Sequence, residues 1–180
     1  MGFAMVEMLV AVSLIFLVLP GALSVSVKAI TTSSYQKDKM IATYLAEEGQ
    51  ELVRSIRDRN TLSILNGSYG DWDTGFGGGL CSATPCKIDI MNETLSTGSG
   101  NLGNLALPSD PSYLLYVSAN GFYSHNVSGT RTQFYRGVYV TPVGNPSPNE
   151  QVLVRSIVVW QTPFGRKKVV SSGFLSNWLQ

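Results

Sequence analysis

The sequence predicts an α+β fold in which one long N-terminal helix packs on an antiparallel sheet of about four strands. An almost uncharged apolar run over residues 3–27 passes into a helical pattern that extends to about Arg59. The segments after Pro111 instead change to a period of two. A chain of 180 residues has room for one anchor and one small domain. We therefore expect a single globular domain attached to a membrane-spanning helix.

The apolar run from Phe3 to Val27 is long enough to cross a bilayer, since about 20 apolar residues span the hydrocarbon as a helix. Its single charge is Glu7. A carboxylate in such a segment costs roughly 2.5–3.5 kcal/mol, so we expect it to have a functional partner. The alternatives are an ordinary anchor that tolerates the acid and a secretory signal peptide, although the apolar core of a signal peptide has only about 7–15 residues.

The residues around this acid have a specific order. Gly2 and Phe3 are followed by Glu7, four residues after the phenylalanine, and by Met8-Leu9-Val10. This order closely resembles the N-terminus of type IV pilins and of the pseudopilins of type II secretion. The resemblance implies cleavage between Gly2 and Phe3 by a prepilin peptidase and N-methylation of Phe3. It also implies that Glu7 pairs with the N-terminal amine of a neighbouring subunit, which would offset the desolvation of both charges in hydrocarbon.

The resemblance implies a structural subunit, minor-pilin-like, whose partners are other pilin subunits, the peptidase and an inner-membrane assembly platform. It leaves open a type IV pilus, a secretion pseudopilus or a competence filament. Since Met1 alone precedes Gly2, we expect residues 1–2 to be the remainder of a basic leader or the start to be misassigned.

The orientation in the membrane is predicted differently by charge and by family. Lys28, Lys37 and Lys39 follow the span, and the positive-inside rule would place that side in the cytoplasm. The resemblance implies the opposite: a single-pass protein of the cytoplasmic membrane whose C-terminal domain lies outside, before it joins an extracellular or periplasmic filament. We follow the resemblance.

Pro20 and Gly21 interrupt the apolar run. Proline removes a helical hydrogen bond and clashes with the preceding turn, so we expect a kink or a locally melted turn at this position. The resemblance implies that such a break helps the helix to extend during assembly, and a static kink is the alternative.

Residues 28–60 are predicted to continue the helix as the amphipathic helix of the globular domain, with the chain leaving it near Asn60. The whole helix would measure roughly 85 Å. Glu51 with Arg54, and Arg54 with Asp58, are spaced for ion pairs. Apolar positions recur at helical spacing, with one gap at Glu48-Gly49, and the charged residues fall elsewhere: Ile41, Tyr44, Leu45, Leu52 and Ile56 against Lys37, Asp38, Glu47, Glu51, Arg54 and Asp58.

Residues 61–111 are predicted to be an irregular loop region, dense in turn-forming residues. It holds the two cysteines, Cys81 and Cys86. For an exported domain we expect a disulfide, with two buried thiols as the alternative, and no zinc site. Residues 71–75 lack the closing acids of a calcium loop, and residues 75–79 lack the lysine of a phosphate-binding loop. We expect no metal and no cofactor.

Residues 112–180 are predicted to form the sheet, since four segments rich in β-branched and aromatic residues lie between turn sequences. The third has apolar residues on both faces and is predicted to be central, and a hairpin through Thr162–Arg166 should join it to the last. The four segments are Tyr113–Ser118, Thr132–Thr141, Val152–Gln161 and Lys167–Leu175.

Chemistry beyond assembly has little support in the sequence. His125 is the sole histidine and is predicted to be a loop residue, so we expect no enzymatic activity. Arg166, Lys167 and Lys168 lie beside Phe164 in the last hairpin and could contact DNA or another surface. A solubilising turn that protects a sheet edge is the simpler interpretation. The second function class is therefore a membrane-anchored or filament-tip binding module for a surface, a secreted substrate or DNA.

Overall fold

The computed structural model of the chain describes residues 3–76, 80–90, 94–98, 102, 110–144 and 151–178. The chain divides into two compact units, Met1–Lys39 and Met40–Gln180. Within the described residues there is one α-helix, one short 3-10 helix and seven strands. These elements are α1 (Phe3–Leu65), β1 (Cys86–Ile88), β2 (Leu95–Thr97), η1 (Pro111–Tyr113), β3 (Leu114–Val117), β4 (Tyr123–Ser124), β5 (Thr130–Pro142), β6 (Gln151–Thr162) and β7 (Gly165–Ser176).

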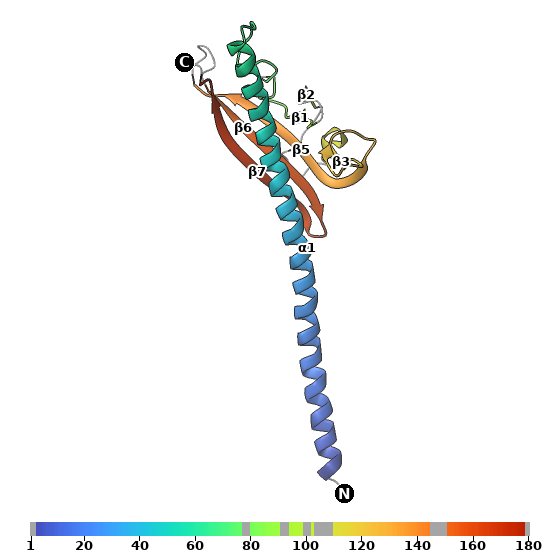
Figure 1. Cartoon of the computed structure of the whole chain (residues 1–180). Coiled ribbons are helices and arrows are strands. Elements are labelled where there is room, and N and C mark those ends of the chain that lie inside the picture. Colours follow the sequence, from blue (N-terminus) through green and yellow to red (C-terminus); the bar gives the residue numbers. More distant parts are fainter. Residues whose placement is uncertain are drawn as a thin grey trace. The chain divides into compact units, whose positions relative to one another are not determined.

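The predicted α+β class is confirmed: a single long N-terminal helix precedes an antiparallel sheet, on which its C-terminal part packs (Figure 1). The helix ends at Leu65, later than predicted. Its end is closed by Gly67, which has a φ of 87°, and by the Ser68 amide, which donates to the Ser63 carbonyl at 3.0 Å. Asn60 does not end the helix because its side-chain amide instead donates to the backbone carbonyl of Thr74 at 2.8 Å.

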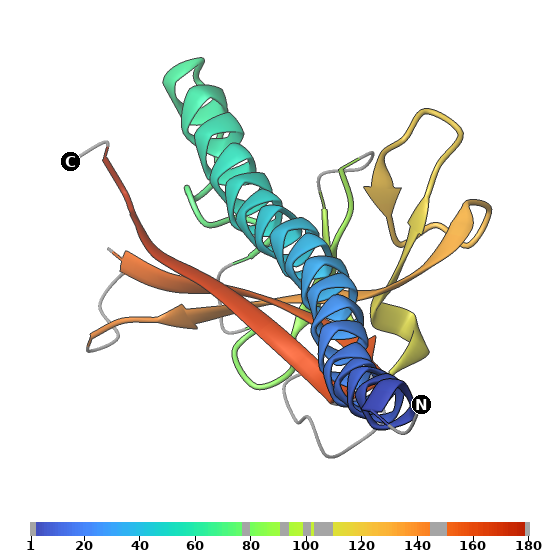
Figure 2. The same cartoon turned by 90° about the horizontal axis from the view of Figure 1, so that it is seen from below.

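The four predicted strands are present as β3, β5, β6 and β7, and the sheet contains three more. The three long strands lie side by side, with β6 between β5 and β7 (Figure 2). On its other side β5 pairs with β1 and with β3, which in turn pair with β2 and β4. Sequence could not show β1, β2 and β4, because strands of two or three residues are too short to display a period of two.

The core of the second unit lies between α1 and one face of the sheet. The buried residues of the helix follow the predicted spacing in part: Ala42, Leu45, Ala46, Leu52, Val53 and Ile56. Tyr44, predicted to belong to this stripe, is 58% exposed, and Ile41 is only partly buried. The stripe is rotated by about one residue from the prediction, since the small residues Ala42 and Ala46 pack on the sheet in place of the tyrosine.

The predicted gap at Glu48-Gly49 is the closest approach of helix and sheet rather than a break in the contact. Gly49 is buried, and a Cβ at this position would overlap the Oγ of Ser156 and lie 3.2 Å from the Cδ of Arg136. Both contacts come from the middle of the sheet, on β6 and β5. Only glycine therefore fits here without a shift of the helix or of the Ser156 side chain.

The other face of the central strand is also covered. Ile157 and Val159 of β6 pack with Leu102 and Tyr113 in a separate apolar cluster. Val152, Val154 and Val158 of the same strand face the helix. This confirms the prediction that this strand is central and apolar on both faces.

Candidate functional site

The N-terminal unit is an exposed apolar helix. Its large apolar side chains from Met5 to Ile30 are between 46% and 76% exposed and lie on all sides of the helix. Among the described residues, α1 is the one helix long and apolar enough to cross a membrane. A helix that is apolar all round needs lipid or other helices around it. The unit is therefore compatible with a single-pass membrane anchor.

Glu7 lies in this apolar surface, one turn after the helix begins at Phe3. It is exposed, and no basic side chain in the described part of the chain forms an ion pair with it. Its neighbours Val6 and Met8 are 60% and 73% exposed. The described residues of this chain therefore show no ion-pair partner for this carboxylate. Gly2, on the other side of the predicted cleavage point, lies outside the described residues.

Pro20 and Gly21 remain helical, so of the two expected forms of the break the locally melted turn is not present, and the kink stays a prediction. Because Pro20 has no amide hydrogen, the helix lacks one backbone hydrogen bond at this position, but it continues through the turns on either side. Nearby hydroxyl groups also bond to the backbone: Ser13 donates to the Leu9 carbonyl at 2.6 Å and Ser24 to the Gly21 carbonyl at 2.8 Å. Such bonds satisfy polar side chains within an apolar environment.

The predicted disulfide is present between Cys81 and Cys86, both fully buried. Backbone pairing fixes this short loop to the sheet, because the Val140 amide donates to the Cys81 carbonyl at 3.1 Å. The Tyr113 hydroxyl donates to the Pro85 carbonyl at 2.8 Å, and burial raises its pKa to about 12, which keeps it protonated as a donor. This part of the loop region is thus firmly attached to the core.

The three cations of the last hairpin are successive residues of β7, directly after the turn from β6, so Lys167 lies on the opposite face of the strand from Arg166 and Lys168. The Nη1 atom of Arg166 is buried, without a hydrogen-bond partner among the described residues. Thr162 pairs with Gly165 across the turn, and Phe164 at its tip is 79% exposed. Lys168 is exposed, whereas Arg166 and Lys167 are partly buried. In the described part of the chain none of the three forms an ion pair with an acid.

A buried charge that the sequence interpretation missed lies under the helix. Arg136 on β5 is fully buried, and its guanidinium is 3.2 Å from the carboxylate of Glu48. It also donates to the carbonyls of Leu45 on α1 and Ile88 on β1, at 3.3 and 3.1 Å. Two sequence signals pointed to this pair: an arginine at an apolar position of an alternating strand, and an acid at the gap in the helical stripe.

His125 lies in the loop after β4, as predicted, and is partly buried. Its Nδ1 is 3.3 Å from the Leu114 carbonyl, while Nε2 is buried without a hydrogen-bond partner among the described residues. Burial, and secondarily the charge of Arg136, lower its pKa to about 4. Asp89 opposes the shift and Lys87 adds weakly to it. The histidine is therefore neutral at pH 7.

This shift predicts a pH-dependent stability. Between pH 6.5 and about 4 the unfolded chain binds a proton at His125 that the folded chain does not, so stability falls as the pH falls through this window and then levels off. The loss should reach up to about 3 kcal/mol. Urea unfolding of the wild type and of His125→Asn at pH 7.5 and pH 4.5 measures it. The variant should lose less stability on acidification than the wild type, and equal losses would contradict the assignment.

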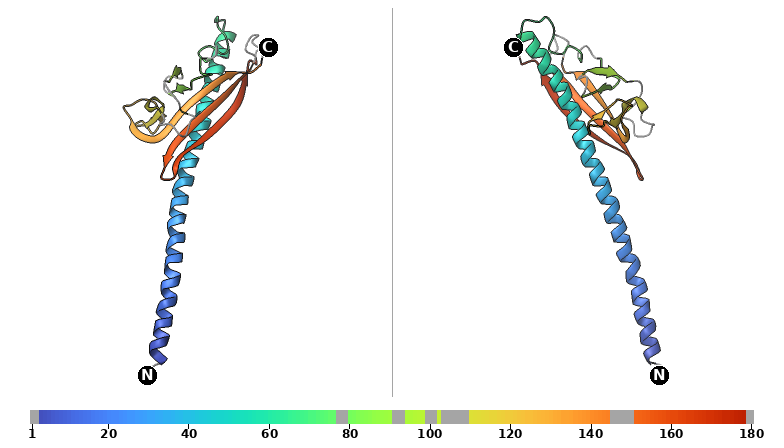
Figure 3. Two further views of the ribbon diagram at one scale, coloured as in Figure 1. Left: turned by 180° about the vertical axis from the view of Figure 1, so that it is seen from behind. Right: turned by 45° about the vertical axis from the view of Figure 1, so that its right-hand side comes forward.

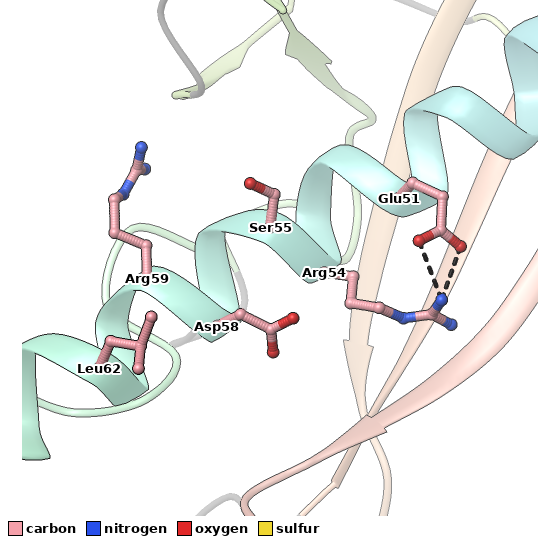
Figure 4. Close-up of a pocket in the computed structure, with 6 residues that line it drawn as sticks. All are labelled: Glu51, Arg54, Ser55, Asp58, Arg59 and Leu62. Carbon is pink, nitrogen blue, oxygen red and sulfur yellow. Dashed lines mark hydrogen bonds and ion pairs between the residues drawn. The ribbon is translucent and has the colours of Figure 1, made fainter.

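The charged face of α1 forms a shallow depression lined by Glu51, Arg54, Ser55, Asp58, Arg59 and Leu62 (Figure 4). The predicted pair of Arg54 and Glu51 is present at 2.6 Å. Asp58 was expected to pair with Arg54 but is 2.8 Å from the Nε of Arg57 instead. Exposed pairs of this kind are typical of a solvated helix face.

Comparison of the chain with models of protein families finds no matching family, and comparisons with curated proteins and with solved structures find no significant match. The resemblance to pilins therefore rests on the residues around Glu7 and on an architecture that is compatible with it, one apolar N-terminal helix followed by an antiparallel sheet.

Proposed function

We propose that the chain is a non-enzymatic structural subunit, a minor pilin or pseudopilin, of a type IV pilus-like filament. The observation that carries the proposal is Glu7, an exposed acid without a basic partner in the described part of the chain, on a helix whose apolar side chains are exposed on all sides. Such a surface fits lipid before assembly and the helices of neighbouring subunits afterwards.

In this proposal a prepilin peptidase cuts between Gly2 and Phe3, and the amine of Phe3 is methylated. Glu7 of one subunit then pairs with that amine of the next, at the level of the apolar helices. An ammonium and a carboxylate left alone in hydrocarbon are each penalised, whereas the pair offsets both costs. Assembly thus depends on processing. Before assembly the subunit is anchored in the cytoplasmic membrane with its second unit outside. An assembly platform in that membrane then incorporates it into the filament.

We expect Glu7→Ala to leave membrane insertion unchanged and to lower incorporation into filaments by about tenfold or more, because the amine of the neighbour loses its counter-charge. Membrane flotation and immunoblotting of sheared filaments measure the two quantities. Glu47→Ala is the matched control, since Glu47 is an exposed acid on the same helix outside the apolar run. If Glu7→Ala enters filaments as often as the wild type, Glu7 has no role in assembly. If mass spectrometry finds an N-terminus other than methyl-Phe3, the proposed processing does not occur.

A second proposal is a membrane-anchored or filament-tip binding module. The observation that favours it is the β6–β7 hairpin, with its exposed Phe164 and three cations that form no ion pair with an acid in the described residues. The phosphates of DNA are one partner that such a turn could contact. The experiment below separates this partner from a lipid surface.

A further inference from the structure

The β6–β7 hairpin lies at one particular end of the second unit. Trp160 and Val169, close to its tip, pack with Ala42 and Leu45 at the start of the helix in this unit. At the opposite end of the sheet Leu175 packs with the later helical residues in a separate cluster. The hairpin tip therefore lies at the end of the second unit where that unit's part of α1 begins, at Met40 (Figures 1 and 3).

The chain tethers this end to the membrane-spanning segment. Residues 28–39 are helical and cover about 18 Å at 1.5 Å per residue. The polar headgroup region adds roughly 5–7 Å outside the hydrocarbon on each side of a bilayer. If the inserted segment ends near Val27, this tether holds the entry end of the second unit no more than about 11–13 Å beyond the headgroup region.

The side chains at the tip suit that environment. The turn is held by Thr162, whose hydroxyl donates to the Gly165 carbonyl at 2.6 Å and accepts from the Phe164 amide at 3.3 Å. Phe164 is 79% exposed on this fixed turn. Arg166, Lys167 and Lys168 follow it, and no acid in the described part of the chain forms an ion pair with them. An exposed aromatic beside several cations is typical of an element that lies in a membrane interface.

We propose that the β6–β7 hairpin binds the anionic headgroups of the bilayer in which the chain's own apolar helix is inserted. The cations contact the lipid phosphates, and Phe164 enters the boundary between headgroups and acyl chains. The contact orients the second unit on the membrane before assembly and is released when the subunit leaves the bilayer. It rests on the membrane-anchored state of the function proposed above. The tether favours lipid over DNA, because it keeps the tip near a membrane.

A fluorescent probe on the hairpin tests this. Both native cysteines are in the disulfide, so Phe164→Cys in the full-length chain is labelled at one position with a polarity-sensitive nitrobenzoxadiazole group. The labelled protein is reconstituted into vesicles of phosphatidylcholine alone or mixed with phosphatidylglycerol, with brominated acyl chains as quencher. We expect a blue shift and quenching in the anionic vesicles, both reduced by high salt. The variant Arg166→Gln, Lys167→Gln, Lys168→Gln should lose them.

Phe174→Cys is the matched control, because Phe174 is an aromatic residue of β7, 59% exposed, near the end of the strand that is farther from the turn. Equal quenching at positions 164 and 174, or a response at 164 that does not depend on anionic lipid, would overturn the inference. A probe that responds to duplex DNA but not to anionic vesicles would assign the hairpin to nucleic acid instead. A chain that does not float with vesicles contradicts the anchor as well, whereas a chain that floats with an indifferent probe contradicts this inference alone.

Discussion

Replacing Glu48 with alanine is expected to lower the free energy of unfolding of the second unit by about 3 kcal/mol. The substitution leaves the guanidinium of Arg136 fully buried without its carboxylate, and arginine cannot lose its proton to relieve the cost. We take the lower end of the range for broken buried pairs because the Glu48 side chain is 30% exposed. Two backbone carbonyls still bind the arginine, which also limits the loss.

A second substitution, at Arg136, tests whether Glu48 and Arg136 act as a pair, because its effect on stability should change sign when Glu48 is absent. Arg136→Met should destabilise the wild type, because it leaves the carbonyls of Leu45 and Ile88 without their donor. In the Glu48→Ala background the same change should restore about 1–2 kcal/mol, because it removes the unpaired charge. Urea unfolding of the four full-length variants in detergent measures both effects. Additive losses would mean that the two residues do not act as a pair.

Replacing Gly49 with valine is expected to destabilise the second unit by about 3 kcal/mol or more, and with alanine by about 1–3 kcal/mol. Either side chain would overlap the Oγ of Ser156, because that atom occupies the space that a Cβ at this position needs. The Ser156 side chain would have to leave its position or the helix would have to move away from the sheet, which would open the apolar contacts on both sides of Gly49. Thermal unfolding followed by circular dichroism measures the loss.

Two controls separate overlap from helix propensity. Gly21→Ala is in the same helix, but a Cβ there meets nothing within 4 Å, so it should not lower the stability of the second unit. Ser156→Ala should be nearly neutral alone, since its buried Oγ has no hydrogen-bond partner among the described residues. Combined with Gly49→Ala it should recover part of the loss. A Gly49→Ala variant as stable as the wild type would show that the contact is not tight.

The sequence predicted those parts of the fold that depend on long, regular patterns. The apolar run predicted the helix, and the alternating β-branched residues predicted the strands β3, β5, β6 and β7. The helix end was placed too early because Asn60 is a poor helix former, although it continues the helix and binds the loop at Thr74 through its side chain. Such a tertiary contact has no local signal in the sequence.

The candidate site was predicted unevenly for the same reason. The disulfide follows from two cysteines close together in the chain, and it is present. The pair of Glu48 and Arg136 joins residues far apart in the sequence, so it became visible only when the helix was placed on the sheet. The partners of Glu7 would come from another molecule, and the structure of one chain does not contain them. That role stays a prediction.

The close contact at Gly49 also determines how the second unit would carry a mechanical load. A pull along the helix loads its contact with the sheet in shear rather than peeling it open. Sliding by about one helical turn would bring Leu45 or Val53, each four residues from Gly49 on the same face, to the position where only glycine fits. Gln50, which accepts a hydrogen bond from Ser171 on β7 at 2.7 Å, would have to break that bond as well. Steric overlap at this position therefore opposes sliding of the helix before the apolar contacts separate. A subunit held in a filament by its N-terminal helix would need this resistance under tension.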